Sequence, residues 1–302
     1  MKIEKLECQD GVILSLELSL ISDISDGSIH GDGDWLVFTH GIGEHLGRHR
    51  YLLKLFSKKF NIALYDLRGH GRSGGQRADI QNFRQFSDDL REILVFLRKK
   101  YKMKSYMLLA HSMGCLVTAD FLQDLISKKE AGFVSTGESA FDQLPQRVFL
   151  CAPPVGFANV VAKFLKRFSS VTNFLSKIPI AVPLKETINL YGLSHDLSVY
   201  SEYKDDPLNS ECLSSRLLLN LISASGRVFS LPIGLMRQLI PLGVAQGDAD
   251  DVVDAALTEI YFKRVEPASE LKIIRGGYHE LHNEISSYRE QYFAFLQNFI
   301  SP

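Results

Sequence analysis

The feature that most constrains the fold is a series of short apolar runs separated by segments with helical periodicity. Six such runs lie at residues 35–38, 61–65, 106–109, 148–151, 241–245 and 271–274. A run that is apolar on both faces is typical of a parallel strand covered by helices on each side. Between the runs, apolar residues recur at helical spacing, as in residues 86–97, 116–125 and 288–300. The pattern predicts an α/β fold with a mostly parallel central sheet and helices on both faces.

Two segments depart from this alternation. Residues 3–20 alternate apolar and polar around Asp10-Gly11, which predicts an antiparallel hairpin. Residues 153–232 have apolar positions at helical spacing and contain no convincing strand. We therefore predict a core formed by residues 1–152 and 233–302, with residues 153–232 inserted as a helical cap, called the cap segment below.

The overall charge and composition exclude several classes of protein. The chain has 34 Lys and Arg residues against 35 Asp and Glu residues, so no global field recruits nucleic acid. Its N-terminus lacks the apolar core of a signal peptide, and no run approaches the roughly 18 apolar residues of a membrane-spanning helix. The four cysteines lack metal-ligand spacing and are expected as buried free thiols. We expect a cytoplasmic protein that does not bind nucleic acid.

The sequence AHSMG at residues 110–114 lies between an expected strand and an expected helix. Small residues two positions before and after Ser112 permit a tight strand-to-helix turn, which raises the serine above the sheet edge. The backbone N–H of Met113 then lies at a helix N-terminus, where it can stabilise an oxyanion. The usual motif begins with glycine, and Ala110 differs from it by one methyl group. This arrangement predicts that Ser112 is a nucleophile.

A second oxyanion donor is expected after the first parallel strand, where residues 39–45 read THGIGEH. Glycines on both sides of Ile42 free the backbone to turn its N–H toward the site. An ordinary glycine-rich turn at the strand end is the alternative interpretation. His40 and His45 are expected to be structural.

The acid and the base of a serine hydrolase of this kind follow the nucleophile, with the acid first. Only three histidines follow Ser112, and these are His195, His279 and His282. His279 comes directly after the last expected strand, at the edge of the sheet where Ser112 lies, so it is the predicted base. His195 falls in the cap segment, and His282 is expected as a surface or supporting residue.

Several aspartates follow the fifth apolar run, in the sequence GDADDVVD at residues 247–254. The acid must accept a hydrogen bond from the imidazole and stabilise its charged form. Asp250 is the predicted acid on position, although spacing alone leaves Asp248 open. Asp251 and Asp254 are better suited to begin or cap the following helix.

Five segments together resemble the monoacylglycerol lipase and lysophospholipase group of α/β-hydrolases, in the serine aminopeptidase S33 (Hydrolase_4) family. They are HGIGEH at 40–45 with Arg48 and Tyr51 downstream, YDLRGHGRSG at 65–74, HSMG at 111–114, GDADDVVD at 247–254 and GYHE at 277–280. The resemblance implies an α/β-hydrolase fold, with Asp250 as the triad acid and His279 as its histidine. It also implies an oxyanion hole formed by the amides of Ile42 and Met113.

We therefore expect a serine hydrolase that cleaves carboxylic esters of lipids, monoacylglycerols or lysophospholipids, through an acyl-enzyme on Ser112. No metal or organic cofactor is expected. A carboxylesterase or thioesterase for small acyl substrates and an aminopeptidase are alternatives, and a non-catalytic binding protein of the same fold is an alternative of another class. The chain departs from the family pattern at Ala110 and Cys115, where glycine is usual, and most strongly in the cap segment.

The cap segment carries a pattern of its own at residues 157–175, where apolar residues fall at helical spacing. Lys163, Lys166, Arg167 and Lys177 lie off that stripe or beside it. A basic amphipathic helix can rest on an anionic membrane surface or line an acyl-chain tunnel, and packing against the core is the alternative. The expected partners are a lipid or small ester substrate and, through the cap segment, the membrane surface.

Overall fold

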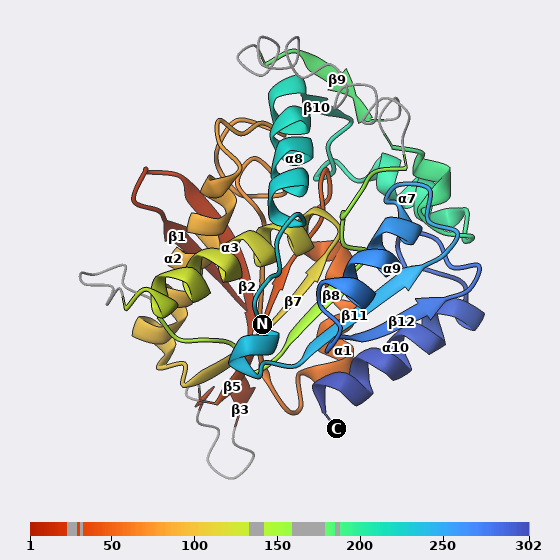
Figure 1. Ribbon diagram of the computed structural model, residues 1–302. Helices are drawn as coiled ribbons and strands as arrows, with labels where there is room; N and C mark the ends of the chain where they lie inside the picture. The colour runs from red at the N-terminus through yellow and green to blue at the C-terminus, as the bar shows by residue number, and fades with distance from the viewer. Residues whose placement is uncertain (23–28, 31–32, 133–141, 159–178, 185–187, 302) are drawn as a thin grey trace.

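The computed structural model of the chain describes residues 1–22, 29–30, 33–132, 142–158, 179–184 and 188–301. At its centre is an eight-stranded sheet in the order β1-β2-β6-β5-β7-β8-β11-β12 (Figure 1). The strands are β1 (Lys2–Glu7), β2 (Ile13–Ser19), β5 (Asp34–Thr39), β6 (Asn61–Tyr65), β7 (Ser105–His111), β8 (Val148–Cys151), β11 (Leu242–Gly247) and β12 (Glu270–Ile274). All six apolar runs of the sequence lie in this sheet, which confirms the predicted α/β architecture.

One strand of the sheet, β2, runs opposite to all the others. β1 and β2 form the predicted antiparallel hairpin, and β2 is also antiparallel to β6. From β6 through β12 every neighbouring pair is parallel. The carboxyl ends of the parallel strands therefore share one edge of the sheet, and residues that follow β5, β7, β11 and β12 meet there.

Helices flank this sheet in two groups (Figure 1). One group contains α2 (Arg84–Tyr101) and α3 (Met113–Glu130), which contact each other, and the other contains α1 (Tyr51–Phe56) and α10 (Ser286–Ile300). Tyr51 joins the second group, since its ring stacks on that of Phe293. Further helical elements are η1 (Leu46–His49), η3 (Met236–Gln238) and α9 (Ala255–Arg264), of which α9 contacts β11 and β12. The three predicted helical stretches lie within α2, α3 and α10.

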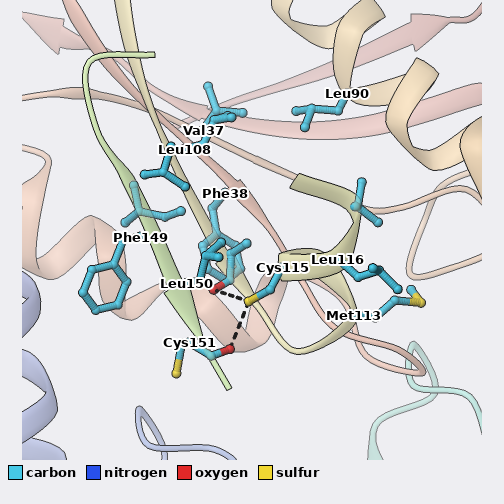
Figure 2. Packing of buried hydrophobic residues seen from close by; sticks show 14 of the residues in the cluster. Val37, Phe38, Leu90, Leu108, Met113, Cys115, Leu116, Phe149, Leu150 and Cys151 are labelled. Atoms are coloured by element: carbon cyan, nitrogen blue, oxygen red, sulfur yellow. Dashed lines mark hydrogen bonds between the residues drawn. The ribbon is translucent and has the colours of Figure 1, made fainter. Parts of the chain in front are cut away.

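The core lies between the central strands and the helices. Figure 2 shows Val37, Leu108 and Leu150, from β5, β7 and β8, in one cluster with Leu116 of α3. All four side chains are fully buried. The start of α3 is buried on all sides because it follows Ser112 directly into this layer, which explains why it carries no polar face there.

Three of the four cysteines are buried free thiols, as predicted, and Cys212 is exposed, contrary to prediction. Cys115 Sγ donates to the carbonyl oxygens of Ala110 and Cys151 at 3.3 and 3.1 Å (Figure 2). Cys212 differs because it begins β10 (Cys212–Ser214), a short strand outside the central sheet.

The cap segment contains strands, so the expectation that it has none is wrong. β9 (Ala181–Pro183) pairs antiparallel with β10, and η2 (Leu190–Gly192), α7 (Ser198–Asp205) and α8 (Ser215–Val228) make up the other described elements. Outside the cap segment, β3 (Ile21–Ser22) and β4 (Ile29–His30) form another short antiparallel pair. Strands of two or three residues are too short to show an alternating pattern, and pairing defines them. Within the described part of the chain, no helix is long and apolar enough to cross a bilayer.

Candidate active site

Ser112 lies in a strained turn between β7 and α3. Its backbone has φ 52° and ψ −122°, a conformation that residues other than glycine rarely adopt. Gly114 makes the turn possible, because a Cβ at that position would lie 2.2 Å from the carbonyl oxygen of Thr39. Ala110 occupies the other position that the motif reserves for a small residue, and its side chain is buried in the core. The structure thus accepts alanine at one position and requires glycine at the other.

The structure brings Ser112, His279 and Asp250 together at the carboxyl edge of the sheet. His279 Nε2 lies 2.9 Å from Ser112 Oγ, and His279 Nδ1 lies 2.8 Å from Asp250 Oδ2. All three residues are buried, with 4 to 8% of their surface exposed. A hydroxyl bonded to an imidazole that is itself oriented by a carboxylate is an arrangement that activates a nucleophile.

The two candidate acids have different surroundings. Asp250 accepts hydrogen bonds from the backbone N–H groups of Val252 and Val253 at 2.9 and 3.0 Å and from Gln246 Nε2 at 3.0 Å. Asp248 instead accepts from the backbone N–H of Gly276 at 2.5 Å. The geometry therefore favours Asp250 as the partner of the imidazole, and Asp254 caps α9 by accepting from Leu257 N.

Burial and charge act in opposite directions on the buried pair. Burial alone would raise the pKa of Asp250, but the charge of His279, its hydrogen bond and the two backbone N–H groups lower the pKa below its usual value. Burial alone would lower the pKa of His279, but the charge of Asp250 and their hydrogen bond raise it above 6.5. The pair therefore favours the charged form of the His279 imidazole.

The loop after β5 lies beside Ser112 and is fastened from two directions. Gly41 N donates to Glu44 Oε1 at 2.5 Å, and the carbonyl oxygen of Gly43 accepts from Tyr203 Oη at 2.8 Å. Ile42, between these two glycines, lines the same pocket as Ser112. Met113 follows Ser112 as the first residue of α3. These are the places expected of two oxyanion donors.

The pocket at Ser112 combines polar groups of the site with five apolar side chains. Leu184, Ile188, Leu190 and Leu193 line it from the cap segment, together with Ile42 from the loop after β5. An apolar lining beside a polar reacting group is suited to a ligand with a hydrocarbon part.

A buried polar cluster, part of which lines the pocket, was not predicted from the sequence. Glu44 Oε1 lies 3.0 Å from His111 Nδ1, and the side chain of Arg48 contacts both Glu44 and Glu280. Glu44, Arg48 and Glu280 all belong to the quoted motifs, so the signal was present without an assigned role. Since Glu44 also binds Gly41 N, the cluster supports the loop that carries Ile42.

Part of this cluster has the composition of a metal site. Ligand atoms of Glu44, His49 and His111 lie within 4.8 Å of one another, the one such group among the residues described. Arg48 Nε lies 3.4 Å from Glu44 Oε2, so a fixed positive charge already faces the carboxylate. That charge opposes a divalent cation at the same place. Glu44 Oε2 instead has Arg48 Nε and His49 Nε2 as its close neighbours, at 3.4 and 3.0 Å.

The remaining histidines singled out in the sequence are structural in their contacts. His40 Nε2 accepts from Leu67 N at 2.9 Å, and His45 Nε2 lies 2.9 Å from Asp206 Oδ2. His282 is buried and packs against the rings of His49 and Tyr51. It is therefore not a surface residue, and a supporting role remains its interpretation. His195 does not touch Ser112; it contacts the loop that carries His279, as described below.

Comparison with known proteins decides the family. The model of the family described as serine aminopeptidase, S33 (Hydrolase_4) matches residues 34–286. The chain belongs to this family. The match spans the chain from β5 through β12, including the cap segment, so the expected resemblance is confirmed.

Members and structural neighbours of known name are similar at modest identity. A monoacylglycerol lipase of Mycolicibacterium smegmatis is 27% identical over 254 residues, 82% of each chain. Phospholipase YtpA of Bacillus subtilis is 26% identical over 258 residues, covering 82% of this chain and 88% of its own. A soluble variant of monoglyceride lipase from Saccharomyces cerevisiae, solved with a substrate analog, superposes with a TM-score of 0.76 at 15% identity over 99% of this chain and 94% of its own. This likeness confirms the α/β-hydrolase fold.

Proposed function

We propose that this protein hydrolyses carboxylic esters of lipids through an acyl-enzyme on Ser112. The observation that carries the proposal is the continuous hydrogen-bonded series from Ser112 through His279 to Asp250. Its position beside the apolar side chains that line the same pocket supports a substrate with an acyl chain.

In the proposed mechanism, His279 accepts the proton of Ser112 as the serine oxygen attacks the ester carbonyl. The amides of Ile42 and Met113 stabilise the oxyanion that forms, and Asp250 stabilises the imidazolium. The imidazolium then gives its proton to the departing alcohol, leaving the acyl group on Ser112. Water activated by His279 releases the carboxylic acid and restores the serine. This sequence needs no metal or organic cofactor.

We propose monoacylglycerols or lysophospholipids as the substrates, with residues 153–232 acting as the cap over the site. Two observations support this choice. Relatives of the chain are named monoacylglycerol lipase and phospholipase. Apolar side chains of the cap segment, such as Leu184 and Leu193, line the pocket beside Ser112.

Labelling with a fluorophosphonate probe tests the nucleophile. We expect the wild-type protein to be labelled and the Ser112→Ala variant, folded to the same melting temperature, to lose both labelling and ester hydrolysis. A folded wild-type protein that hydrolyses no ester and takes up no Ser112-dependent label would instead identify a non-catalytic binding protein of this fold.

A panel of monoacylglycerols, lysophospholipids, aminoacyl peptides and short p-nitrophenyl esters tests the substrate class. We expect kcat/KM to rise with the length of the acyl chain, because a longer chain buries more apolar surface, about 0.8 kcal/mol per methylene group. A preference for short esters, with no gain on longer chains, would favour the small-ester carboxylesterase or thioesterase.

A further inference from the structure

The loop that carries His279 is held by a short stretch of the cap segment. The ring of His195 stacks on the ring of Tyr278, with centroids 3.8 Å apart and planes inclined by 24°. His195 Nδ1 lies 2.8 Å from Glu284 Oε1. Because Tyr278 directly precedes His279, this contact bears on the backbone that orients the imidazole.

Glu284 connects the two segments through several hydrogen bonds. Its side chain is fully buried and accepts from the backbone N–H of Tyr278 at 2.9 Å and of His195 at 3.2 Å. Ser194 Oγ lies 3.4 Å from the same carboxylate. One carboxylate therefore fastens the residue before His279 and two residues of the cap segment at once.

Backbone contacts continue the same interface on the other side of His279. Glu280 N donates to the carbonyl oxygen of Leu193 at 2.8 Å. Ser194 Oγ donates to the carbonyl oxygen of Asn283 at 2.9 Å. His279 is thus flanked on both sides by residues that bind residues 193–195.

We propose that His195 and Glu284 are a positioning pair that holds His279 in line with Ser112. The inference rests on the proposed function, since alignment matters only if His279 transfers a proton. A misplacement of about 1 Å between reacting groups can cost about 100-fold in rate. The pair makes the cap segment part of the support for the catalytic histidine, in addition to its lining of the pocket.

A second ion pair between the cap segment and the core provides a matched control. Arg216, at the start of α8, donates from Nε to Asp79 Oδ1 at 3.0 Å, and the Asp79 side chain is almost as buried as that of Glu284. Among the described residues, the side chains of this pair bond to each other and to Ser214, and not to residues 276–284. Its removal therefore measures how the loss of a buried contact between the cap segment and the core affects stability and kcat when the His279 loop is not involved.

Three variants test the positioning role: His195→Phe, His195→Arg and Arg216→Gln. His195→Phe retains a ring that can stack on Tyr278 but loses the bond to Glu284, and we expect kcat to fall 10- to 100-fold with KM changed less than 2-fold. His195→Arg should retain at least a third of the wild-type kcat, because a guanidinium both stacks on aromatic rings and binds carboxylates. Arg216→Gln should lower stability without lowering kcat. A kcat loss in His195→Phe no greater than that in Arg216→Gln would overturn the proposal.

Hydrogen exchange separates failure of this proposal from failure of the proposed function. We expect the amides of residues 276–284 to exchange at least 10-fold faster in His195→Phe than in wild type, and at the wild-type rate in Arg216→Gln. Unchanged exchange in His195→Phe would refute the positioning role of His195 and Glu284, even if Ser112 is labelled by a fluorophosphonate. If exchange is faster in His195→Phe but the wild-type protein shows no Ser112-dependent labelling, His195 and Glu284 hold the loop but the proposed function is wrong.

Discussion

His279 and Asp250 are buried together, and each favours the charged form of the other. In the proposed mechanism the raised pKa of His279 affects activity, because only the neutral imidazole can accept the proton of Ser112. As pH falls through this raised pKa, the base becomes protonated and activity is lost.

We therefore expect the acid limb of the kcat/KM profile against pH to have its midpoint above 6.5. The measurement is hydrolysis of a soluble ester from about pH 5 to about pH 9, a range that includes the ordinary pKa of histidine, about 6.5. Asp250→Asn should move the midpoint lower, because it removes the charge that raises the pKa of His279. A wild-type midpoint at or below the ordinary histidine value would contradict the assigned coupling.

The choice between the two aspartates yields a second prediction at this scale. Asp250→Asn should reduce kcat on the order of 10⁴-fold, the size of loss seen when the acid of a serine triad becomes an amide. Asp248→Asn should change kcat far less, since Asp248 binds the backbone of Gly276 instead of the imidazole. Both variants are compared in one ester assay after their folding is checked by circular dichroism. A larger loss in Asp248→Asn would reverse the assignment.

At the scale of elements, the site depends on how closely the end of β11 approaches the loop that carries His279. Gly247 ends β11, and a Cβ there would lie 2.2 Å from the carbonyl oxygen of Gly277. No side chain can be accommodated without moving one backbone segment away from the other. The same displacement would separate Asp250 from His279.

Gly247→Ala should therefore lower both stability and activity. We expect a loss of about 1–3 kcal/mol in the free energy of unfolding, the usual cost of overpacking, together with a fall in kcat. Urea unfolding and the ester assay measure the two effects. Gly33→Ala is the control, because among the described residues its Cβ would meet only Asn61 Nδ2 at 3.4 Å, an ordinary contact. Equal behaviour of the two variants would show that the two segments do not need this close approach.

The elements of the core were predictable because each carries its own signal. A parallel strand buried on both faces is mostly apolar, as β8 is throughout and β6 is after Asn61, and a helix such as α2 must repeat its apolar residues every three or four positions. β9 and β10 carry no such signal, because a pair of three-residue strands is defined by its partner and not by its composition.

At the scale of the whole molecule, the open question is how a lipid substrate reaches the pocket. The basic amphipathic pattern at residues 157–175 supports a peripheral membrane contact, although residues 159–178 lie outside the described part of the chain. We propose that this pattern attracts the protein to anionic lipid surfaces, each basic residue contributing about 1 kcal/mol.

Replacement of Lys163, Lys166 and Arg167 by Gln should then weaken binding to phosphatidylserine vesicles at least 10-fold. Flotation with vesicles measures the effect, and neutral phosphatidylcholine vesicles should show little change. A triple variant of Lys54, Lys58 and Lys59, exposed residues before β6 at the opposite edge of the sheet, removes the same charge elsewhere. Equal weakening by both variants would indicate a general charge effect and reject the cap segment as the contact.

The sequence by itself determined the α/β architecture, the strand-to-helix turn at Ser112 and the order of the candidate site residues. These follow from local periodicity and from motifs whose residues are neighbours in the chain. Spacing alone left both Asp248 and Asp250 possible as the acid, and position and the family resemblance favoured Asp250.

The tertiary structure alone decided which distant groups meet. The pairing of His195 with Glu284 joins residues separated by 89 positions, and the contact of Glu44 with His111 joins residues separated by 67. Neither pair has a local signature, because a buried carboxylate and an imidazole reveal their partnership only when folding removes both from water. The support beneath and beside Ser112 is therefore a property of packing, while Ser112 itself is visible in the sequence.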